Sequence, residues 1–161
     1  MQQVQDYVSL TMYTSNVAVG GPGGNPFSLI ATWPAVVKRI TLYRDQQRPK
    51  FKGIYVERYD SSVLNVGGGF ASADPSPLSY TFDEDERLTR ILLYSSSSSN
   101  RFSGLELNTT KQVVKAFAYG YNASQCDMVE IPVGNGKWNG IFGKAGGDID
   151  SFGIAMLTGA T

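Results

Sequence analysis

The sequence predicts an all-β fold, and three observations support that prediction. Apolar and polar residues alternate in short runs, which is the period of strands that are buried on one face. The clearest runs come in pairs separated by turn-forming residues, as in β-hairpins. The 18 glycines and 7 prolines are spread between the runs, and glycine supplies the positive φ angles that tight turns require. Long helices are therefore not expected.

The alternating runs define the expected strands in chain order. The first two form a hairpin across the polar turn 44–50, and a later pair flanks the acidic turn 83–86. The strands are expected at residues 36–43, 51–59, 78–82, 88–94, 102–107, 113–118, 128–133, 138–143 and 152–157. We expect about a dozen short strands in all.

The length and composition suit one packed domain. The chain has 161 residues, of which 42% are hydrophobic. Five serines at 95–99 could be a linker between two domains, but neither flank contains enough strands to close a core of its own. We expect an ordinary loop there and a single domain over residues 1–161. Trp33 and Trp138 are expected in the core or on a strand surface.

The charged residues exclude several classes of partner and reaction. The 14 Lys and Arg residues balance the 14 Asp and Glu residues, so no long-range positive field would attract nucleic acid or an anionic membrane. The chain has no histidine, which is the commonest general base and the commonest metal ligand. Its single cysteine, Cys126, cannot form an intramolecular disulfide. We expect a neutral partner, no metal, no cofactor and no catalytic site.

The N-terminal residues carry no recognisable targeting signal. They have neither the basic nor the apolar region of a secretory signal, and no later window approaches the roughly 20 apolar residues of a membrane span. A soluble, cytoplasmic protein without membrane insertion is expected. A secreted protein is the alternative if the chain is a mature form that begins at a new Met1.

Glycine clusters recur at residues 20–24, 67–69 and 143–147 and divide the chain into segments of broadly similar length. This spacing suggests internal pseudo-symmetry. Glycine-rich backbone also exposes N–H groups to any ligand that approaches it. The middle cluster could equally be no more than a tight turn.

Two of these glycine-rich segments give the chain a resemblance to a known family. Residues 20–27 read GGPGGNPF, and residues 140–153 read GIFGKAGGDIDSFG. In order and separation they resemble the two loops that form the monosaccharide site of jacalin-related lectins. The resemblance covers about residues 17–158 and implies a type I β-prism, three four-stranded Greek-key sheets about a pseudo-threefold axis. The number of expected strands and the three glycine clusters agree with that fold.

The resemblance also implies which residues would contact a sugar. Backbone N–H groups would be offered by both loops, and Asp150 would contribute its side-chain carboxylate. A carboxylate can accept hydrogen bonds from two neighbouring hydroxyls, here O4 and O6, while the N–H groups donate to the same oxygens and to the ring oxygen. The residues implied are Gly24, Gly146, Gly147, Asp148 and Asp150.

The chain departs from the family pattern at several positions. Phe27 is followed by Ser28 and Leu29, where the family often has an acidic residue. Gly147 and Asp148 stand where many members have an aromatic residue that packs on the ligand. Stacking on the sugar is therefore not expected, and Asp148 adds a charge.

Some family members carry a second sugar site in another Greek key. The corresponding hairpin here, residues 43–48, reads YRDQQR and lacks the family's G-x-x-x-D turn. One site per chain is expected, with Asp45 and Gly68 as candidate residues for a second. Galactose-binding members use a cleaved chain whose free amine lies in the site, whereas Gly24 is internal to a continuous chain. Mannose or glucose in glycans is therefore the expected ligand.

Other interpretations of the same residues remain open. Asp150 could be only a turn aspartate that caps its own loop. Asp148 and Asp150 could be the carboxylate pair of a glycoside hydrolase, although residues two apart on one tight turn rarely face each other across a substrate. A β-prism could also be a structural or protein-interaction module with a degenerate sugar site. A shallow sugar site would bind at about millimolar concentration, so a homo-oligomer carrying several sites is expected.

Overall fold

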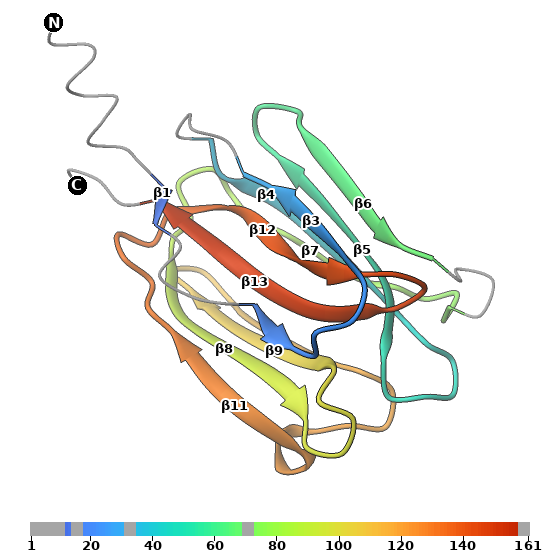
Figure 1. The fold of residues 1–161 in the computed structure, drawn as a ribbon. Helices are drawn as coiled ribbons and strands as arrows, with labels where there is room; N and C mark the ends of the chain where they lie inside the picture. Colours follow the sequence, from blue (N-terminus) through green and yellow to red (C-terminus); the bar gives the residue numbers. More distant parts are fainter. Residues whose placement is uncertain (1–11, 14–17, 31–34, 69–72, 158–161) are drawn as a thin grey trace, which may run out of the picture.

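The computed structural model describes residues 12–13, 18–30, 35–68 and 73–157. Within these residues the chain is almost entirely strand, and the only helix is the short 3-10 turn Ala123–Gln125. Figure 1 shows the strands arranged as three sheets around a common interior. No helix in this part of the chain is long and apolar enough to cross a membrane.

The first sheet joins the beginning and the end of the described chain. Its strands are β1 (Met12–Tyr13), β2 (Val19–Gly20), β3 (Asn25–Leu29), β12 (Trp138–Ala145) and β13 (Ile149–Leu157). Their order is β1-β13-β12-β3, and β2 also pairs with β13. β1 lies beside the C-terminal end of β13 and β2 beside its N-terminal half. The two short strands share one edge, so this sheet is four strands wide.

The other two sheets are each formed by four consecutive strands. The second sheet has the order β6-β5-β4-β7, from β4 (Val37–Arg44), β5 (Phe51–Arg58), β6 (Val63–Gly67) and β7 (Leu78–Thr81). The third has the order β10-β9-β8-β11, from β8 (Leu88–Ser96), β9 (Phe102–Thr109), β10 (Val113–Phe117) and β11 (Cys126–Ile131). In each sheet the fourth strand returns beside the first, which is the Greek-key order. The predicted all-β fold of three four-stranded antiparallel sheets, a β-prism, is confirmed.

The three sheets repeat the same irregularity. Each has a central hairpin of two long strands, β4–β5, β8–β9 or β12–β13, and its register shifts by one residue where the second strand begins. The extra residue is Lys52 in β5, Ser103 in β9 and Asp150 in β13. A β-bulge bends the strand and redirects the side chain of the extra residue. These three positions are therefore equivalent under the pseudo-threefold symmetry.

The core lies between the sheets and includes one phenylalanine from each. Phe51, Phe102 and Phe152 are fully buried. The rings of Phe51 and Phe102 stack at 5.3 Å between centroids, and those of Phe102 and Phe152 at 4.8 Å. Burial of each such side chain stabilises the fold by about 1.5 to 3 kcal/mol. The stack therefore holds the three sheets together close to their bulges.

Every strand that the sequence predicted overlaps an observed one, but β1, β2, β3 and β6 were not predicted. The two strands that flank the acidic turn do not form a hairpin, because β7 pairs with β4 and β8 pairs with β9 and β11. β1 and β2 have only two residues each, too few for a detectable alternation. β3 contains Pro26 and lies at the edge of its sheet, where a missing backbone N–H can be tolerated on the free side. β6 is also an edge strand and none of its residues is buried. The serine run ends β8 and turns into the hairpin loop before β9, as expected.

The expectation of a packed tryptophan is confirmed for Trp138. Its side chain is buried, its Nε1 donates a hydrogen bond to the carbonyl of Gly140 at 2.9 Å, and its ring meets Phe82 edge to face. Trp33 lies outside the described residues. Cys126 is half-buried. Burial and the neighbouring Asp127 carboxylate raise the pKa of its thiol, which keeps the thiol protonated near neutral pH.

Candidate functional site

The first and last glycine-rich loops meet at one end of the prism. The first loop runs from β2 to β3, and the last joins β12 to β13. Since β2 pairs with β13 and β3 with β12, the pairing register brings the two loops together. The backbone N–H of Gly21 donates to the carbonyl of Asp150 at 3.0 Å. Two segments more than 120 residues apart in the chain thus form one surface.

Asp150 stands at the centre of this surface because it is the bulge residue of β13. Its side chain is 21% exposed, so the carboxylate can be reached from solvent. A Cβ atom placed on Gly23 would lie 3.3 Å from its Oδ1, and one on Gly24 would lie 2.7 Å from its Oδ2. Gly24 also has a φ of +83°, a conformation that costs glycine little. The first loop can therefore approach the carboxylate this closely only with glycine at residue 24.

The last loop presents open backbone next to Asp150. The N–H of Gly146 donates to the carbonyl of Asp148 at 2.9 Å, which closes the turn. A Cβ atom on Gly146 or Gly147 would meet no atom within 4 Å. The side of the turn where those side chains would point is thus free for a ligand. Gly68, which follows β6, lies against a different side of this turn. A Cβ atom placed on Gly68 would be 3.4 Å from the Cα of Gly147.

The carboxylate of Asp148 points towards the second sheet. Lys50 Nζ donates to its Oδ2 at 3.0 Å, and Lys52 Nζ donates to its Oδ1 at 2.6 Å. Burial alone would raise the pKa of Asp148, but the hydrogen bonds and charges of Lys52 and Lys50 outweigh burial and hold this pKa below its usual value. Asp148 is therefore held as a carboxylate by two lysines, and its side chain is directed away from Asp150 towards the second sheet.

Three cationic residues around the site were not identified from the sequence. Lys50 and Lys52 come from the β4–β5 hairpin, and Arg101 comes from the loop between β8 and β9. The Arg101 Nε lies 3.6 Å from Oδ1 of Asp150. All three Greek keys therefore contribute to one end of the prism. No local motif marks these residues, because each reaches a carboxylate 49 to 98 residues away: Asp150 for Arg101, and Asp148 for Lys50 and Lys52.

The two residues considered for a second site have different surroundings. Asp45 is 7% exposed, and its Oδ1 accepts hydrogen bonds from the backbone N–H groups of Gln47 and Arg48, each at 2.8 Å. Burial raises the pKa of Asp45, but these turn N–H groups and the nearby lysines lower it further than burial raises it. Asp45 thus caps its own turn, whereas Gly68 lies against the last loop.

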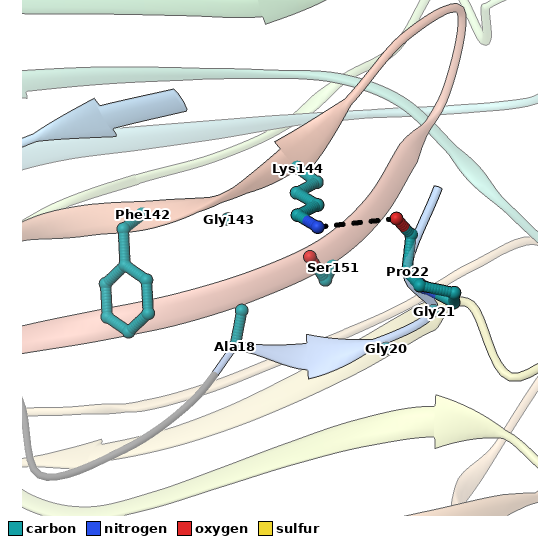
Figure 2. Close-up of a pocket in the computed structure, with 8 residues that line it drawn as sticks. All are labelled: Ala18, Gly20, Gly21, Pro22, Phe142, Gly143, Lys144 and Ser151. Carbon is teal, nitrogen blue, oxygen red and sulfur yellow. Dashed lines mark hydrogen bonds between the residues drawn. The ribbon is translucent and has the colours of Figure 1, made fainter. Parts of the chain in front are cut away.

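A hollow of about 530 Å³ continues from the first loop over the outer face of the first sheet. Figure 2 shows Lys144 of β12 reaching across Ser151 towards Pro22, whose carbonyl is 3.5 Å from the ammonium nitrogen. Phe142 lines the same hollow, and its ring fills the space that a side chain on Gly153 would need. Lys144 of β12 thus contacts the first loop at Pro22. Within the described residues no group of three Cys, Asp or Glu side chains could hold a metal ion.

Comparisons with known proteins agree with this architecture. Residues 17–155 match the sequence model of the family described as the jacalin-like lectin domain. No curated protein sequence matches the chain. Among solved structures, the lamprey immune protein is similar, with a TM-score of 0.76 and 22% identity over 93% of this chain and 45% of that one. This chain thus spans less than half of the lamprey protein.

Two plant lectins are similar over nearly their whole length. A mannose-binding jacalin-related lectin from Ananas comosus has a TM-score of 0.67 and 17% identity over 94% of this chain and 99% of that one. A mannose-specific jacalin-related lectin from Morus nigra has a TM-score of 0.68 and 18% identity over 93% and 95%. These likenesses concern the fold, while the family match covers most of the sequence. The chain belongs to the jacalin-like lectin domain family.

Proposed function

We propose that the chain is a non-catalytic carbohydrate-binding domain that holds one mannose or glucose residue of a glycan. The proposed site comprises Gly24, Gly146, Gly147, Asp148 and Asp150. The observation that carries the proposal is the position of the Asp150 carboxylate. It is partly exposed, it lies on a β-bulge, and the backbone of the first loop packs directly against it.

The chemistry of these groups suits a pyranose. The two carboxylate oxygens of Asp150 can accept hydrogen bonds from two neighbouring hydroxyls. Backbone N–H groups of Gly24, Gly147 and Asp148 are donors and would complete the hydrogen bonds of the same oxygens. The pairing of the Asp148 side chain with two lysines leaves its main chain as its contribution to this site.

The preference for mannose or glucose is supported by the continuity of the first loop. Gly24 lies between β2 and β3 within an unbroken chain, so it offers a neutral peptide N–H rather than a charged terminal amine. The similar lectins from Ananas comosus and Morus nigra are mannose-binding proteins. We infer that the same hydroxyl pattern is read here.

A single site per chain is supported by the three bulges. Asp150, Lys52 and Ser103 occupy equivalent positions, and only Asp150 carries a carboxylate. One site of this kind binds at about millimolar concentration, which corresponds to about 4 kcal/mol. Useful affinity for a glycan would then require several linked sites, so we also propose that the protein is a homo-oligomer.

Hydrolysis of a glycoside is not supported by the two aspartates. A general acid for that reaction needs a raised pKa. The pKa of Asp148 is lowered, and its carboxylate oxygens are held by Lys50 and Lys52. The lowered pKa of Asp148 and its two ion pairs therefore do not support a role as proton donor opposite Asp150.

The proposal is tested by calorimetric titration of methyl α-mannoside and methyl α-galactoside into the wild type and Asp150→Asn. We expect mannoside binding at about millimolar concentration, a loss of at least tenfold in Asp150→Asn, and weaker or no binding of galactoside. The control is Asp85→Asn, which removes an exposed aspartate from the acidic turn between β7 and β8 and should bind as the wild type does.

Two results would contradict the proposal. Equal affinity of wild type and Asp150→Asn would remove Asp150 from the site. Absence of binding by the wild type at tens of millimolar would favour a structural or protein-interaction module with a degenerate sugar site.

A further inference from the structure

We propose that a basic hollow beside the sugar site binds one anionic group of a glycan, a carboxylate or a sulfate. The hollow has a volume of about 430 Å³ and lies at the turn between β4 and β5. All of its lining side chains are polar or charged: Asp45, Gln46, Gln47, Arg48, Lys50 and Lys52. The proposal rests on the proposed function in one respect: the anionic group is taken to belong to the glycan whose mannose or glucose residue binds at Asp150.

The lysines of this hollow are held in place before any ligand arrives. The side chain of Lys50 is 16% exposed and that of Lys52 is 9% exposed. Each donates one hydrogen bond to Asp148, and an ammonium group has three donors. Each lysine therefore keeps donors for a ligand without losing the orientation that Asp148 imposes.

Arg48 adds a guanidinium group to the hollow. The residue is exposed on the turn, and its backbone N–H is fixed by Asp45. Its side chain forms no ion pair within the described residues. A guanidinium group presents paired donors that match the geometry of a carboxylate or a sulfate.

The charges in and around the hollow favour a single negative group. Arg48, Lys50 and Lys52 contribute three positive charges. Asp45 and Asp148 contribute two negative charges, and both have lowered pKa values, so both are ionised near neutral pH. One positive charge is left over, and a monovalent anion would neutralise it.

The position of Lys52 connects the hollow with the sugar site. Lys52 occupies in the second sheet the bulge position that Asp150 occupies in the first. Where one Greek key presents a carboxylate that accepts hydrogen bonds from hydroxyls, the next presents an ammonium group that donates them. Asp148 belongs to the last loop of the sugar site and contacts Lys52, so the two features are adjacent.

A polyanion is a poorer match than one acidic sugar. The whole chain has 14 positive and 14 negative residues, so it offers no extended field for nucleic acid or a membrane. The hollow has about the volume that a sugar residue with its acidic group requires.

The test uses nuclear magnetic resonance titrations of the ¹⁵N-labelled protein with two pairs of probes. The pair of methyl β-glucuronide and methyl β-glucoside tests a carboxylate, and the pair of galactose 6-sulfate and galactose tests a sulfate. We expect at least one acidic probe to shift the backbone amides of residues 46–50, at a Kd on the order of millimolar, and its neutral counterpart to leave them unchanged. Raising the NaCl concentration from about 50 to 300 mM should weaken this binding severalfold.

Two variants locate the binding. Arg48→Gln leaves both ion pairs of Asp148 intact and is expected to lower the affinity for the acidic probe several-fold. The double variant Arg48→Gln/Lys50→Gln is expected to lower this affinity at least tenfold. The control is Lys115→Gln, which removes an exposed positive charge from β10 and should have no effect.

The outcomes separate this proposal from the sugar site. Binding of an acidic probe that depends on Arg48 and Lys50 but persists in Asp150→Asn supports the hollow, whether or not methyl α-mannoside binds. If neither acidic probe binds at tens of millimolar, or if binding is the same in the double variant, the proposal is wrong and the lysines serve only to hold Asp148. Loss of acidic-probe binding in Asp150→Asn would place the probe in the sugar site instead. That result would also contradict the proposal that the basic hollow binds the anionic group.

Discussion

At the scale of single residues, the candidate site depends on where a side chain is absent. Gly24 has a positive φ, and its Cβ position would lie 2.8 Å from the carbonyl carbon of Ala145 as well as against Asp150. Gly147 has open space at its Cβ position. The two glycines therefore have different reasons to be glycine: close approach of backbone at the first, and exposed backbone at the second.

A matched pair of substitutions tests this difference. We expect Gly24→Ala to destabilise the protein by about 1 to 3 kcal/mol and to abolish mannoside binding, because the added methyl group meets both backbone and the carboxylate. Gly147→Ala should change the free energy of unfolding by no more than about 0.5 kcal/mol. Urea denaturation followed by circular dichroism measures both. Equal stability of the two variants would show that the first loop relaxes around a side chain.

At the scale of secondary-structure elements, the β12–β13 hairpin is tied to the β4–β5 hairpin by one ion-paired cluster. Asp148 of the first hairpin accepts hydrogen bonds from Lys50 and Lys52 of the second. These three side chains are at most 18% exposed, so solvent screens their interaction less than it screens a pair on the open surface. The cluster thereby fixes the loop whose N–H groups are proposed to meet the sugar.

The stabilisation by this cluster should depend on pH in a defined direction. The folded-state pKa of Asp148 is lowered, so its contribution is complete above the unfolded pKa of about 3.9 and is lost as the pH falls through the folded pKa. We expect Asp148→Asn to cost about 1 to 3 kcal/mol at pH 7 and clearly less as the pH falls below about 4.

The measurement is the free energy of unfolding of the wild type and of Asp148→Asn, each at pH 7 and at about pH 3. Asp127→Asn, on the exposed strand β11, is the control for loss of a carboxylate and should show little difference at either pH. A cost of Asp148→Asn that is the same at pH 3 and pH 7 would mean that its charge does not stabilise the fold.

At the scale of the whole molecule, three sheets share one core. Phe102 of the third sheet stacks on Phe51 of the second and on Phe152 of the first. Small sheets of four strands have little core of their own, so their stability depends on this shared interior. We therefore expect the sheets to unfold together.

Phe102→Ala tests that expectation. It should lower the free energy of unfolding by about 3 to 5 kcal/mol and leave a single transition that coincides by tryptophan fluorescence and circular dichroism. Val113→Ala, at a residue that is 61% exposed, should change stability by no more than about 0.5 kcal/mol. Two separate transitions would instead indicate that one sheet folds independently, which would contradict the single domain predicted from the sequence.

The sequence was informative where a pattern is long and local. Strands of eight or nine residues, such as β4, β8 and β13, carry a readable alternation, whereas the two-residue strands β1 and β2 do not. The two glycine-rich loops were recognisable because turn residues leave a local signature. Asp45 was harder to interpret, because only the structure shows that its carboxylate is occupied by its own turn.

The sequence by itself determined the all-β class, the β4–β5 hairpin and the two loops that carry Gly24 and Asp150. These features follow from the periodicity and turn chemistry of neighbouring residues. Tertiary structure alone decided that Lys50, Lys52 and Arg101 would surround those loops, and that the equivalent bulges would carry a lysine, a serine and an aspartate. The physical reason is that strand register and bulges set these contacts, and the registers are chosen by the packing of three sheets on one core rather than by any local run of residues.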